Sequence, residues 1–194
     1  MVRSELITGA DGVVRCGWVT SAPEYERYHD DEWGTPFRTE RDMFEKVCLE
    51  GFQAGLSWIT ILRRRPAFRA AFDNFDPHTV AEFDPPRVEI LMNDSGIIRN
   101  RAKIQSCVSN AQIVVEMLER GESLVDLVWS FAPRGQRTRP RTLAQLPAIT
   151  SESEALSAEL RRRGFRFVGA TTMYALMQSE GLVDDHLVGC HRAS

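Results

Sequence analysis

The stretch of sequence that decides the fold runs from Val88 to Ile104 and reads VEILMNDSGIIRNRAKI. Its first half carries apolar residues at the three- and four-residue spacing of one helix face: Val88, Leu91 and Met92. Ser95-Gly96 then predicts a tight turn, and a second helix begins beyond it with basic residues. The stretch therefore predicts two helices joined by a hairpin turn, although an ordinary corner between helices has the same pattern.

The residues at and after this turn are suited to phosphate. A glycine turn that opens a helix exposes backbone N–H groups at the positive end of the helix dipole, where anions bind. Positive side chains follow at once in this sequence. We therefore expect a helix-hairpin-helix that contacts a DNA backbone through Gly96, Arg99, Arg101 and Lys103.

Helical signals recur along the rest of the chain, and strand signals are almost absent. Thr39 opens an amphipathic helix, and the longest periodic run spans residues 100–120. Asp76 and Asp84 each precede a proline, as a cap precedes the first turn of a helix. Other predicted boundaries are an end or restart at Pro66 of the helix that Ser57 opens, a cap at Ser151 or Ser153, and a start at Thr171 or Thr172. The fold class is all-α, in one compact unit.

Size and composition limit the class of protein. The chain has 194 residues, of which 43% are hydrophobic and 26% charged, enough for one well-buried core. No apolar run reaches the roughly 20 residues that a membrane span needs. The first ten residues lack the basic and apolar segments of a secretory signal. We expect a cytoplasmic protein without membrane contact.

The charge distribution favours a local rather than a global attraction to nucleic acid. The net charge of −3 argues against binding by bulk attraction alone. Basic side chains nevertheless gather in three places, at residues 63–69, 99–103 and 134–141. Each cluster could be a solvated surface, but three of them on an acidic chain indicate one positive face turned toward phosphate.

Two cysteines and two histidines near the chain ends form a possible metal site: Cys16, His29, His186 and Cys190. Two thiolates and two neutral imidazoles fill a tetrahedral zinc site and leave no open position, which argues against a zinc-activated water. The four-residue spacing of His186 and Cys190 puts both on one face of a helical turn. The alternatives are that Cys190 is a buried apolar residue and the histidines are surface residues, or that His191 is a ligand. The combination predicts one structural zinc ion that ties the two chain ends together.

Glu50 falls late in an otherwise apolar helix and has aromatic residues around it in the sequence. Gln53 shares its helix face, and Trp58 follows shortly after. Further aromatic residues are Trp18, Tyr25, Tyr28 and Trp33. A carboxylate among ring faces suits a flat, positively charged ligand, through cation–π attraction and a charged hydrogen bond. The alternative is that Glu50 caps or pairs with an arginine and the rings belong to the core.

Six segments carry a resemblance to a known family. They are residues 15–19 (RCGWV), 28–34 (YHDDEWG), 49–58 (LEGFQAGLSW), 96–104 (GIIRNRAKI), 163–169 (RGFRFVG) and 185–190 (DHLVGC). These segments resemble the 3-methyladenine DNA glycosylase I family, from about Arg15 to Cys190. The resemblance implies a helix-hairpin-helix superfamily enzyme, with residues 1–14 as a flexible N-terminal extension. Residues 15–194 would form a single glycosylase domain of two tightly packed helical lobes.

The resemblance also implies roles for individual residues. It implies a structural zinc on the four Cys and His residues, base contacts from Glu50 and Tyr28, and stacking of the base on Trp58. The expected partner is double-stranded DNA that contains alkylated adenine, and we expect a monomer. The family lacks the aspartate that many related glycosylases place shortly after the hairpin, and this sequence has none between Asp94 and Asp126.

The expected reaction is hydrolysis of the N-glycosidic bond of 3-methyladenine, without lyase activity. A methylated adenine is positively charged and leaves readily, so recognition by Glu50 as the catalytic residue can do much of the work. Leu56 is the predicted wedge that fills the gap left by the extruded base, although core packing is its alternative role. The rival function is a non-catalytic helix-hairpin-helix module that binds DNA and contains a structural zinc.

Overall fold

The structure is a computed structural model that describes residues 5–19, 22–135 and 138–193. Residues 1–4 of the predicted extension and Arg137 of the third basic cluster lie outside this part. The elements, in chain order, are β1 (Leu6–Thr8), β2 (Val14–Cys16), α1 (Pro23–Arg27), the π-helical turn η1 (Tyr28–Glu32), α2 (Glu40–Gln53), α3 (Trp58–Ala71), the 3₁₀ turn η2 (Asp73–Phe75), α4 (Pro77–Ala81), α5 (Pro85–Asn93), α6 (Arg101–Glu119), α7 (Leu124–Trp129), the 3₁₀ turn η3 (Leu143–Gln145), α8 (Ser151–Arg162) and α9 (Ala170–Ser179). The described chain is mostly helical, which confirms the predicted class.

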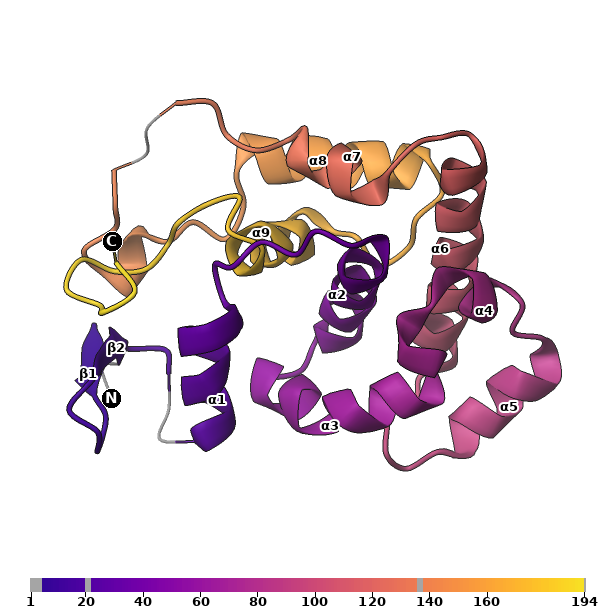
Figure 1. Ribbon diagram of the computed structural model, residues 1–194, viewed down its shortest axis with the longest axis horizontal. Coiled ribbons are helices and arrows are strands. Elements are labelled where there is room, and N and C mark those ends of the chain that lie inside the picture. The colour runs from indigo at the N-terminus through magenta and orange to yellow at the C-terminus, as the bar shows by residue number, and fades with distance from the viewer. Residues whose placement is uncertain (1–4, 20–21, 136–137, 194) are drawn as a thin grey trace.

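Helix α2 lies at the centre of the helical body (Figure 1) and contacts α3, α6, α7 and α9. Every residue of its segment 43–52 is buried, including polar ones. Its neighbours supply a large apolar core with phenylalanine rings from α2, α3 and η2. A side chain on α2 is therefore held rigidly, because the helix is packed on several sides.

Three predicted caps, at Thr39, Asp76 and Asp84, are confirmed, and Asn100 is a fourth cap that was not predicted. The side chains of Thr39, Asp76, Asp84 and Asn100 accept hydrogen bonds from backbone N–H groups in the first turns of α2, α4, α5 and α6. These bonds satisfy amide groups that have no partner inside a helix. Local sequence chemistry thus determines where most of the helices begin.

Three predicted boundaries are wrong. Helix α3 runs through Pro66, an exposed position, because buried Leu62 and Phe68 hold the helix against its neighbours on both sides. Helix α8 is capped by Thr150, whose hydroxyl accepts from the Ser153 amide, one residue before the predicted range. Helix α9 begins at Ala170 after Gly169 rather than at a threonine.

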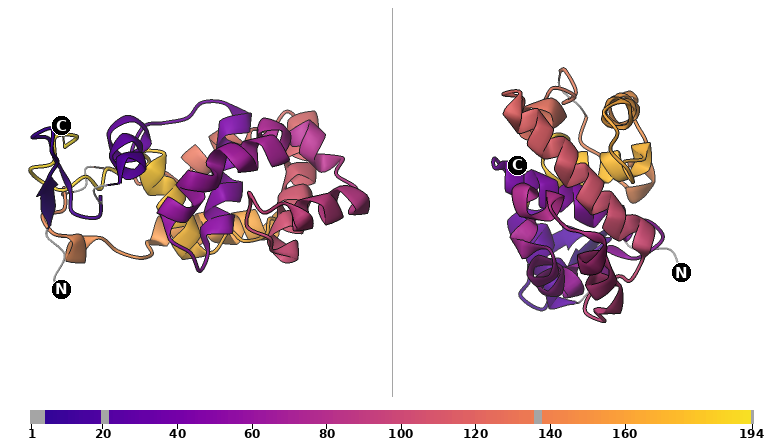
Figure 2. Two further views of the ribbon diagram at one scale, coloured as in Figure 1. Left: turned by 90° about the horizontal axis from the view of Figure 1, so that it is seen from below. Right: turned by 90° about the vertical axis from the view of Figure 1, so that its right-hand side faces the viewer.

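A short hairpin was also missed. Strands β1 and β2 pair antiparallel, with Leu6 opposite Cys16. Three-residue strands carry too little alternation to be recognised in a sequence. The backbone N–H of His191 donates to the Val14 carbonyl oxygen at 2.8 Å. The C-terminal segment therefore lies beside β2 at one end of the molecule (Figure 2). The hairpin includes much of the segment predicted as an extension, whose flexibility stays a prediction.

The segment that opens the sequence analysis forms α5, a turn at residues 94–100 and α6, as predicted. Arg64 of α3 donates to the carbonyl oxygens of Ser95 and Gly96 at 2.7 and 3.0 Å. A Cβ at Gly96 would lie 2.9 Å from the Cβ of Ala67, so the turn packs closely on α3. No helix in the described ranges is long and apolar enough to span a membrane.

Candidate functional site

A cavity of about 220 Å³ opens between η1, α2, α3 and α9. Its lining includes all six residues that the sequence predicted for base binding: Trp18, Tyr25, Tyr28, Trp33, Glu50 and Trp58. The other lining residues are Gln53, Leu146, Ala175 and Gln178. We call this cavity the aromatic pocket. The fold brings together residues that lie up to 40 positions apart in the N-terminal third of the sequence.

Glu50 lies in the aromatic pocket as a buried carboxyl group with one free oxygen. Its side chain is 3% exposed, and its Oε1 is 3.5 Å from Nζ of Lys46. Its Oε2 is buried and has no hydrogen-bond partner among the described residues. Burial raises the pKa of Glu50, and the nearby Lys46 ammonium opposes that rise. The ion-pair partner of Glu50 is therefore Lys46 and not an arginine, as the alternative predicted.

Lys46 contacts both Tyr28 and Glu50. The Lys46 Nζ donates to the Tyr28 hydroxyl oxygen at 2.9 Å, and burial raises the pKa of Tyr28 to about 12. The sequence reasoning missed Lys46. Its four-residue spacing from Glu50 on one helix is the signal that could have found it.

Aromatic contacts hold the walls of the pocket in place. Trp18 meets Tyr25 and Trp33 edge to face, with ring centroids 5.9 and 5.0 Å apart, and Tyr28 meets Trp58 at 5.5 Å. The Tyr25 hydroxyl accepts from the backbone N–H of Ile59 at 3.1 Å. The indole Nε1 atoms of Trp18 and Trp58 are buried, and neither has a partner within the described part of the chain. Residues that line the pocket thus carry two buried N–H donors and one buried carboxylate oxygen without partners among the described residues.

Residues from the C-terminal half close the pocket, and the sequence did not indicate them. Gln178 of α9 donates to Asp185 at 2.8 Å, while Ala175 and Leu146 add apolar surface. No charge or aromatic pattern distinguishes these residues from ordinary core positions. Leu56, the predicted wedge, is not in the lining. It lies in the turn between α2 and α3 and is 41% exposed.

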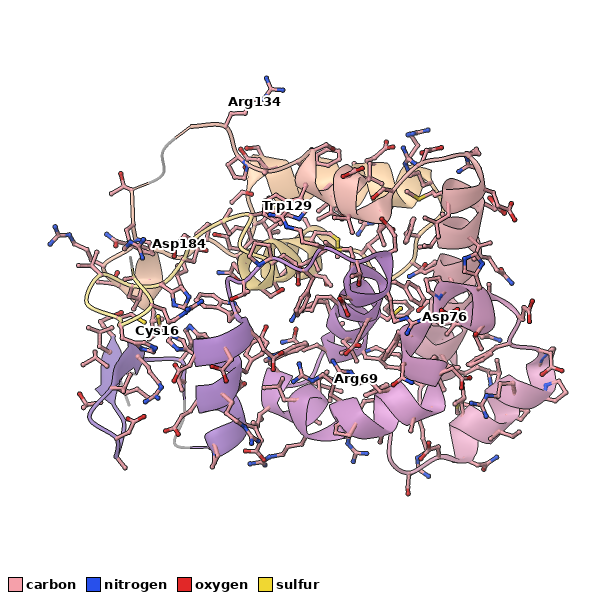
Figure 3. The ribbon with its side chains drawn as sticks, viewed as in Figure 1. Cys16, Arg69, Asp76, Trp129, Arg134 and Asp184 are labelled. Atoms are coloured by element: carbon pink, nitrogen blue, oxygen red, sulfur yellow. The ribbon has the colours of Figure 1, made fainter. Side chains whose placement is uncertain are left out.

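The two cysteines and two histidines predicted as metal ligands come together in one buried group. The donor atoms of Cys16, His29, His186 and Cys190 all lie within 4.8 Å of one another. We call this group the Cys/His cluster, and Figure 3 labels Cys16 where the β hairpin meets the C-terminal segment. A hydrogen bond between the two thiol groups raises the pKa of Cys16 and lowers that of Cys190.

The donor separations in the Cys/His cluster fit a tetrahedral metal. The Cys190 sulfur is 3.4 Å from His29 Nε2 and 3.7 Å from His186 Nδ1, and the Cys16 sulfur is 3.8 Å from His186 Nδ1. Zinc bonds of about 2.3 Å to sulfur and 2.0 Å to nitrogen place such neighbours roughly 3.5 Å apart. The donor set is therefore that of a closed structural site.

Neighbouring oxygen atoms orient both imidazoles. His29 donates from Nδ1 to Asp30 at 2.8 Å, and His186 Nε2 is 3.3 Å from the Trp33 carbonyl oxygen. Such contacts leave the other ring nitrogen of each histidine to face the ligand set. His191, the alternative ligand, groups instead with His29 and Asp30 and contacts the Val14 carbonyl. Trp33 links the cluster to the aromatic pocket.

The pocket and the cluster lie in a sequence that matches a known family. The match to the family model described as Methyladenine glycosylase covers residues 18–193. The chain belongs to the methyladenine glycosylase family. It is therefore an enzyme of the DNA glycosylase class, whose members hydrolyse N-glycosyl bonds.

Relatives with known names agree with this membership. The chain is 51% identical over 177 residues to DNA-3-methyladenine glycosylase 1 of Escherichia coli, covering 91% of this chain and 95% of that protein. A crystal structure of 3-methyladenine DNA glycosylase I matches with a TM-score of 0.89 at 48% identity, covering 92% of this chain and 98% of the other. A structure that concerns 3-methyladenine recognition by the Staphylococcus aureus enzyme matches with a TM-score of 0.84 at 30% identity, covering 89% and 92%.

In this member of the methyladenine glycosylase family, the predicted DNA-backbone residues have unequal surroundings. Arg99 is exposed, and Arg101 is an exposed side chain paired with Glu89. Lys103 is 7% exposed and donates to the carbonyl oxygens of Phe52 and Ala54 at 2.8 and 2.7 Å.

Two members of that predicted set are thus engaged inside the protein. Lys103 caps the C-terminal end of α2, where unpaired carbonyls attract a cation. The Gly96 N–H donates to the Asp94 carboxylate at 2.7 Å, so it does not point to solvent. Phosphate contact by the side chain of Lys103 or the amide of Gly96 is not supported by these contacts, whereas Arg99 and Arg101 are accessible.

Proposed function

We propose that this chain excises 3-methyladenine from alkylated double-stranded DNA by hydrolysing the N-glycosidic bond. The names of its relatives support this substrate. The observation that carries the proposal is the buried Glu50 Oε2 without a partner, in a pocket walled by aromatic rings. An unpaired carboxylate oxygen is costly inside a protein, so such an atom indicates a ligand that completes its hydrogen bonding.

The pocket can recognise a methylated base by shape, stacking and charge together. Trp58 stacks on the flat ring, and Glu50 accepts a hydrogen bond from an N–H group of the base. The free indole N–H groups of Trp18 and Trp58 offer donors to ring nitrogens or to a bridging water. A positive base also gains cation–π attraction from Tyr25, Tyr28 and Trp33.

Chemistry at the sugar needs the base to leave the helix stack. We propose that the nucleotide is flipped into the aromatic pocket and that Leu56, exposed between α2 and α3, fills the gap. The bond from the anomeric carbon to the base nitrogen then breaks, and its electron pair neutralises the cationic base. Water adds its oxygen to the anomeric carbon and loses a proton. Glu50 stabilises the base electrostatically while this charge moves.

The same geometry supports hydrolysis without lyase activity. A lyase step needs a free amine that forms a Schiff base with the sugar. The amine beneath the pocket is Lys46, which is buried, donates to Tyr28 and has a raised pKa, so it stays protonated. A protonated amine with its hydrogens engaged is not a nucleophile.

DNA contact is proposed for the exposed basic side chains near the α5–α6 turn, which are Arg99 and Arg101. Both precede or begin α6, where the helix dipole adds positive potential. Arg101 would exchange its exposed Glu89 partner for a phosphate at little cost, because exposed ion pairs are weak. This is the phosphate-facing part of the predicted helix-hairpin-helix.

One structural zinc ion is proposed for the Cys/His cluster. The residues that would hold it are Cys16, His29, His186 and Cys190. When bound, the ion supplies a covalent-like crosslink between the hairpin and the C-terminal segment, and no open position for water. Its effect on the pocket runs through the contact of His186 with the Trp33 carbonyl.

The predicted organisation is proposed unchanged: a monomer in the cytoplasm, with residues 15–194 as one domain of two lobes. The two apolar clusters of the protein support one unit, because Trp58 packs against both.

Base release from methylated duplex DNA tests this function. Purified protein should release 3-methyladenine, identified by chromatography, and should leave abasic sites whose strands break only after later alkali treatment. Duplex binding without base release would favour the non-catalytic module instead. Strand breaks without alkali would contradict hydrolysis without lyase activity.

A further inference from the structure

Lys46 is a buried cation surrounded by three of the proposed base contacts. It lies on α2 one turn before Glu50 and is 5% exposed. Its Nζ is 2.9 Å from the Tyr28 hydroxyl oxygen, 3.5 Å from Glu50 Oε1 and 4.2 Å from the centroid of the Trp58 ring. One ammonium group therefore touches the residues proposed to read and stack the base.

The hydrogen bond from Lys46 decides how Tyr28 can bond. An ammonium group has three donors and no acceptor, so the Tyr28 oxygen must accept. The hydroxyl hydrogen of Tyr28 must then be donated elsewhere. No acceptor for it occurs in the parts of the chain that the structure describes. Tyr28 thus has a hydroxyl hydrogen left to donate into the pocket.

Lys46 also favours the ionised form of Glu50. Burial raises the pKa of Glu50, and Lys46 is the one charged group that lowers it. Burial lowers the pKa of Lys46 itself, but Tyr28 of η1, Glu50 of α2 and Glu180 after α9 together raise it above its ordinary value. Lys46 also lines a neighbouring cavity together with five charged residues, which are Glu32, Asp42, Glu45, Arg65 and Arg69. Of these, Glu32 interacts electrostatically with Lys46. The carboxylates around Lys46 favour its charged form.

The Lys46 ammonium contacts residues of the pocket wall but does not line the aromatic pocket itself. Trp58 lines both the aromatic pocket and a second cavity of about 100 Å³, and Lys46 lines only the second. A base in the pocket would therefore meet Glu50, Tyr28 and Trp58, while Lys46 would contact those residues and not the base.

We infer that Lys46 is a positioning residue, which keeps Glu50 ionised and turns the Tyr28 hydroxyl into a donor. The pocket then selects a flat base that gives an N–H to Glu50 and a lone pair to Tyr28. This inference rests on the proposed function, because it concerns the same pocket. In this inference, a residue outside the cavity determines which pocket groups donate hydrogen bonds to the base and which accept them.

The test is the pH dependence of 3-methyladenine binding, followed by quenching of tryptophan fluorescence. Binding requires ionised Glu50 and is lost as the pH falls through its pKa. In Lys46→Met the pKa of Glu50 rises further, so the midpoint should move up by about one pH unit. Affinity well above the midpoint should stay within about threefold of the original. Lys46→Arg keeps the charge and should restore the original midpoint.

Arg69→Met is the matched control. Arg69 pairs with Glu45, on the same helix as Lys46, and does not line the aromatic pocket. Its loss removes one positive charge nearby and should leave the midpoint unchanged. The titration of 3-methyladenine itself is common to all variants and cancels in their differences.

The outcomes separate this inference from the proposed function. An unchanged midpoint in Lys46→Met, or an equal loss of affinity at every pH, would show a merely structural lysine and overturn the inference. A protein that binds no 3-methyladenine at any pH would overturn the proposed function instead. In that case, carbon NMR of the Glu50 carboxyl in free protein still tests Lys46, since its pKa should rise in Lys46→Met. Lys46→Gln repeats the test if the methionine variant does not fold.

Discussion

The Cys/His cluster and the aromatic pocket are neighbours with opposite hydrogen-bonding states. In the cluster, both nitrogens of His29 and of His186 have partners, and both sulfurs face imidazoles. In the pocket, Glu50 Oε2 and two indole N–H groups are buried and unpartnered within the described residues. A saturated group stabilises a fold, whereas an unsatisfied one indicates a ligand. The comparison supports the proposal that the cluster stabilises the fold and the pocket recognises the base.

The boundary between the two regions is a single turn. Tyr28 and His29 are consecutive in the π-helical turn η1, yet Tyr28 lines the pocket and His29 belongs to the cluster. π-Helical turns often occur at functional sites. Here the turn directs adjacent side chains into two different environments, so anchoring the histidine also fixes the tyrosine.

The largest expected effect is on stability, from loss of a cluster ligand. Cys190→Ala should lower the free energy of unfolding by about 4 kcal/mol or more, because the proposed metal site would lose one of its four ligands. Urea unfolding and metal content measured together check this. Cys107→Ala, a buried cysteine outside the cluster, is the control and should cost about 1 kcal/mol with full metal content. Equal losses in the two variants would contradict a structural metal.

The next effect is on activity, from loss of the carboxylate in the pocket. Glu50→Gln should slow excision by about 10²- to 10³-fold, because an amide cannot supply the charge that stabilises a cationic base. Single-turnover release of 3-methyladenine measures the rate. Glu45→Gln on the same helix, where Glu45 pairs with Arg69, should excise at the original rate. Equal rates for both variants would remove Glu50 from the reaction.

A smaller effect is expected from the stacking wall. Trp58→Leu should weaken 3-methyladenine binding by about 1–3 kcal/mol, because a base loses its aromatic platform. Isothermal titration with the free base checks the affinity. Trp129, an indole outside the pocket, provides the control variant Trp129→Leu, which should bind normally. Normal binding by Trp58→Leu would place the base elsewhere.

The smallest effect concerns pH, and it tests whether every unpartnered carboxylate oxygen marks a binding site. Glu180 Oε1 is also buried and unpartnered among the described residues, but Glu180 does not line the aromatic pocket. Burial raises the pKa of Glu180 to about 7. A raised carboxyl pKa means that the folded state holds its proton longer than the unfolded state, so stability should fall as pH rises from about 4.5 to 7.

Glu180→Gln should remove that slope and stabilise the protein at pH 8 by roughly 1–2 kcal/mol relative to pH 5. Urea unfolding at the two pH values measures it. Excision should stay near the original rate, because Glu180 lies outside the pocket. An unchanged slope would mean that Glu180 does not titrate in this range, and lost excision would join it to the recognition machinery.

Much of the fold was predictable because its signals are local. The caps at Thr39, Asp76 and Asp84 are properties of a few adjacent residues, and the structure confirms them. Helix α3 passes through Pro66 because tertiary packing outweighs a local preference, which no short segment reveals. The β hairpin is too short to show a period.

The site was predictable where its residues are chemically unusual. The aromatic residues and the four Cys and His residues are uncommon types in suggestive places, Glu50 is a charged residue in an otherwise apolar stretch, and the fold gathers them. Lys46, Ala175 and Gln178 were missed because their types are common on helices, and only the three-dimensional contacts distinguish them. Lys103 was misread for the same reason, since a lysine beside two arginines gives no sign that it points inward.

The central claim is that the pocket recognises the base and the cluster only supports it. The most direct measurement is the rate of 3-methyladenine excision per folded molecule, for Cys190→Ala and Glu50→Gln at a temperature where both are partly or fully folded. We predict that Cys190→Ala stays within about tenfold of the original protein, whereas Glu50→Gln falls by at least about 10²-fold. A folded Cys190→Ala that is as inactive as Glu50→Gln, or a fully active Glu50→Gln, would contradict the account.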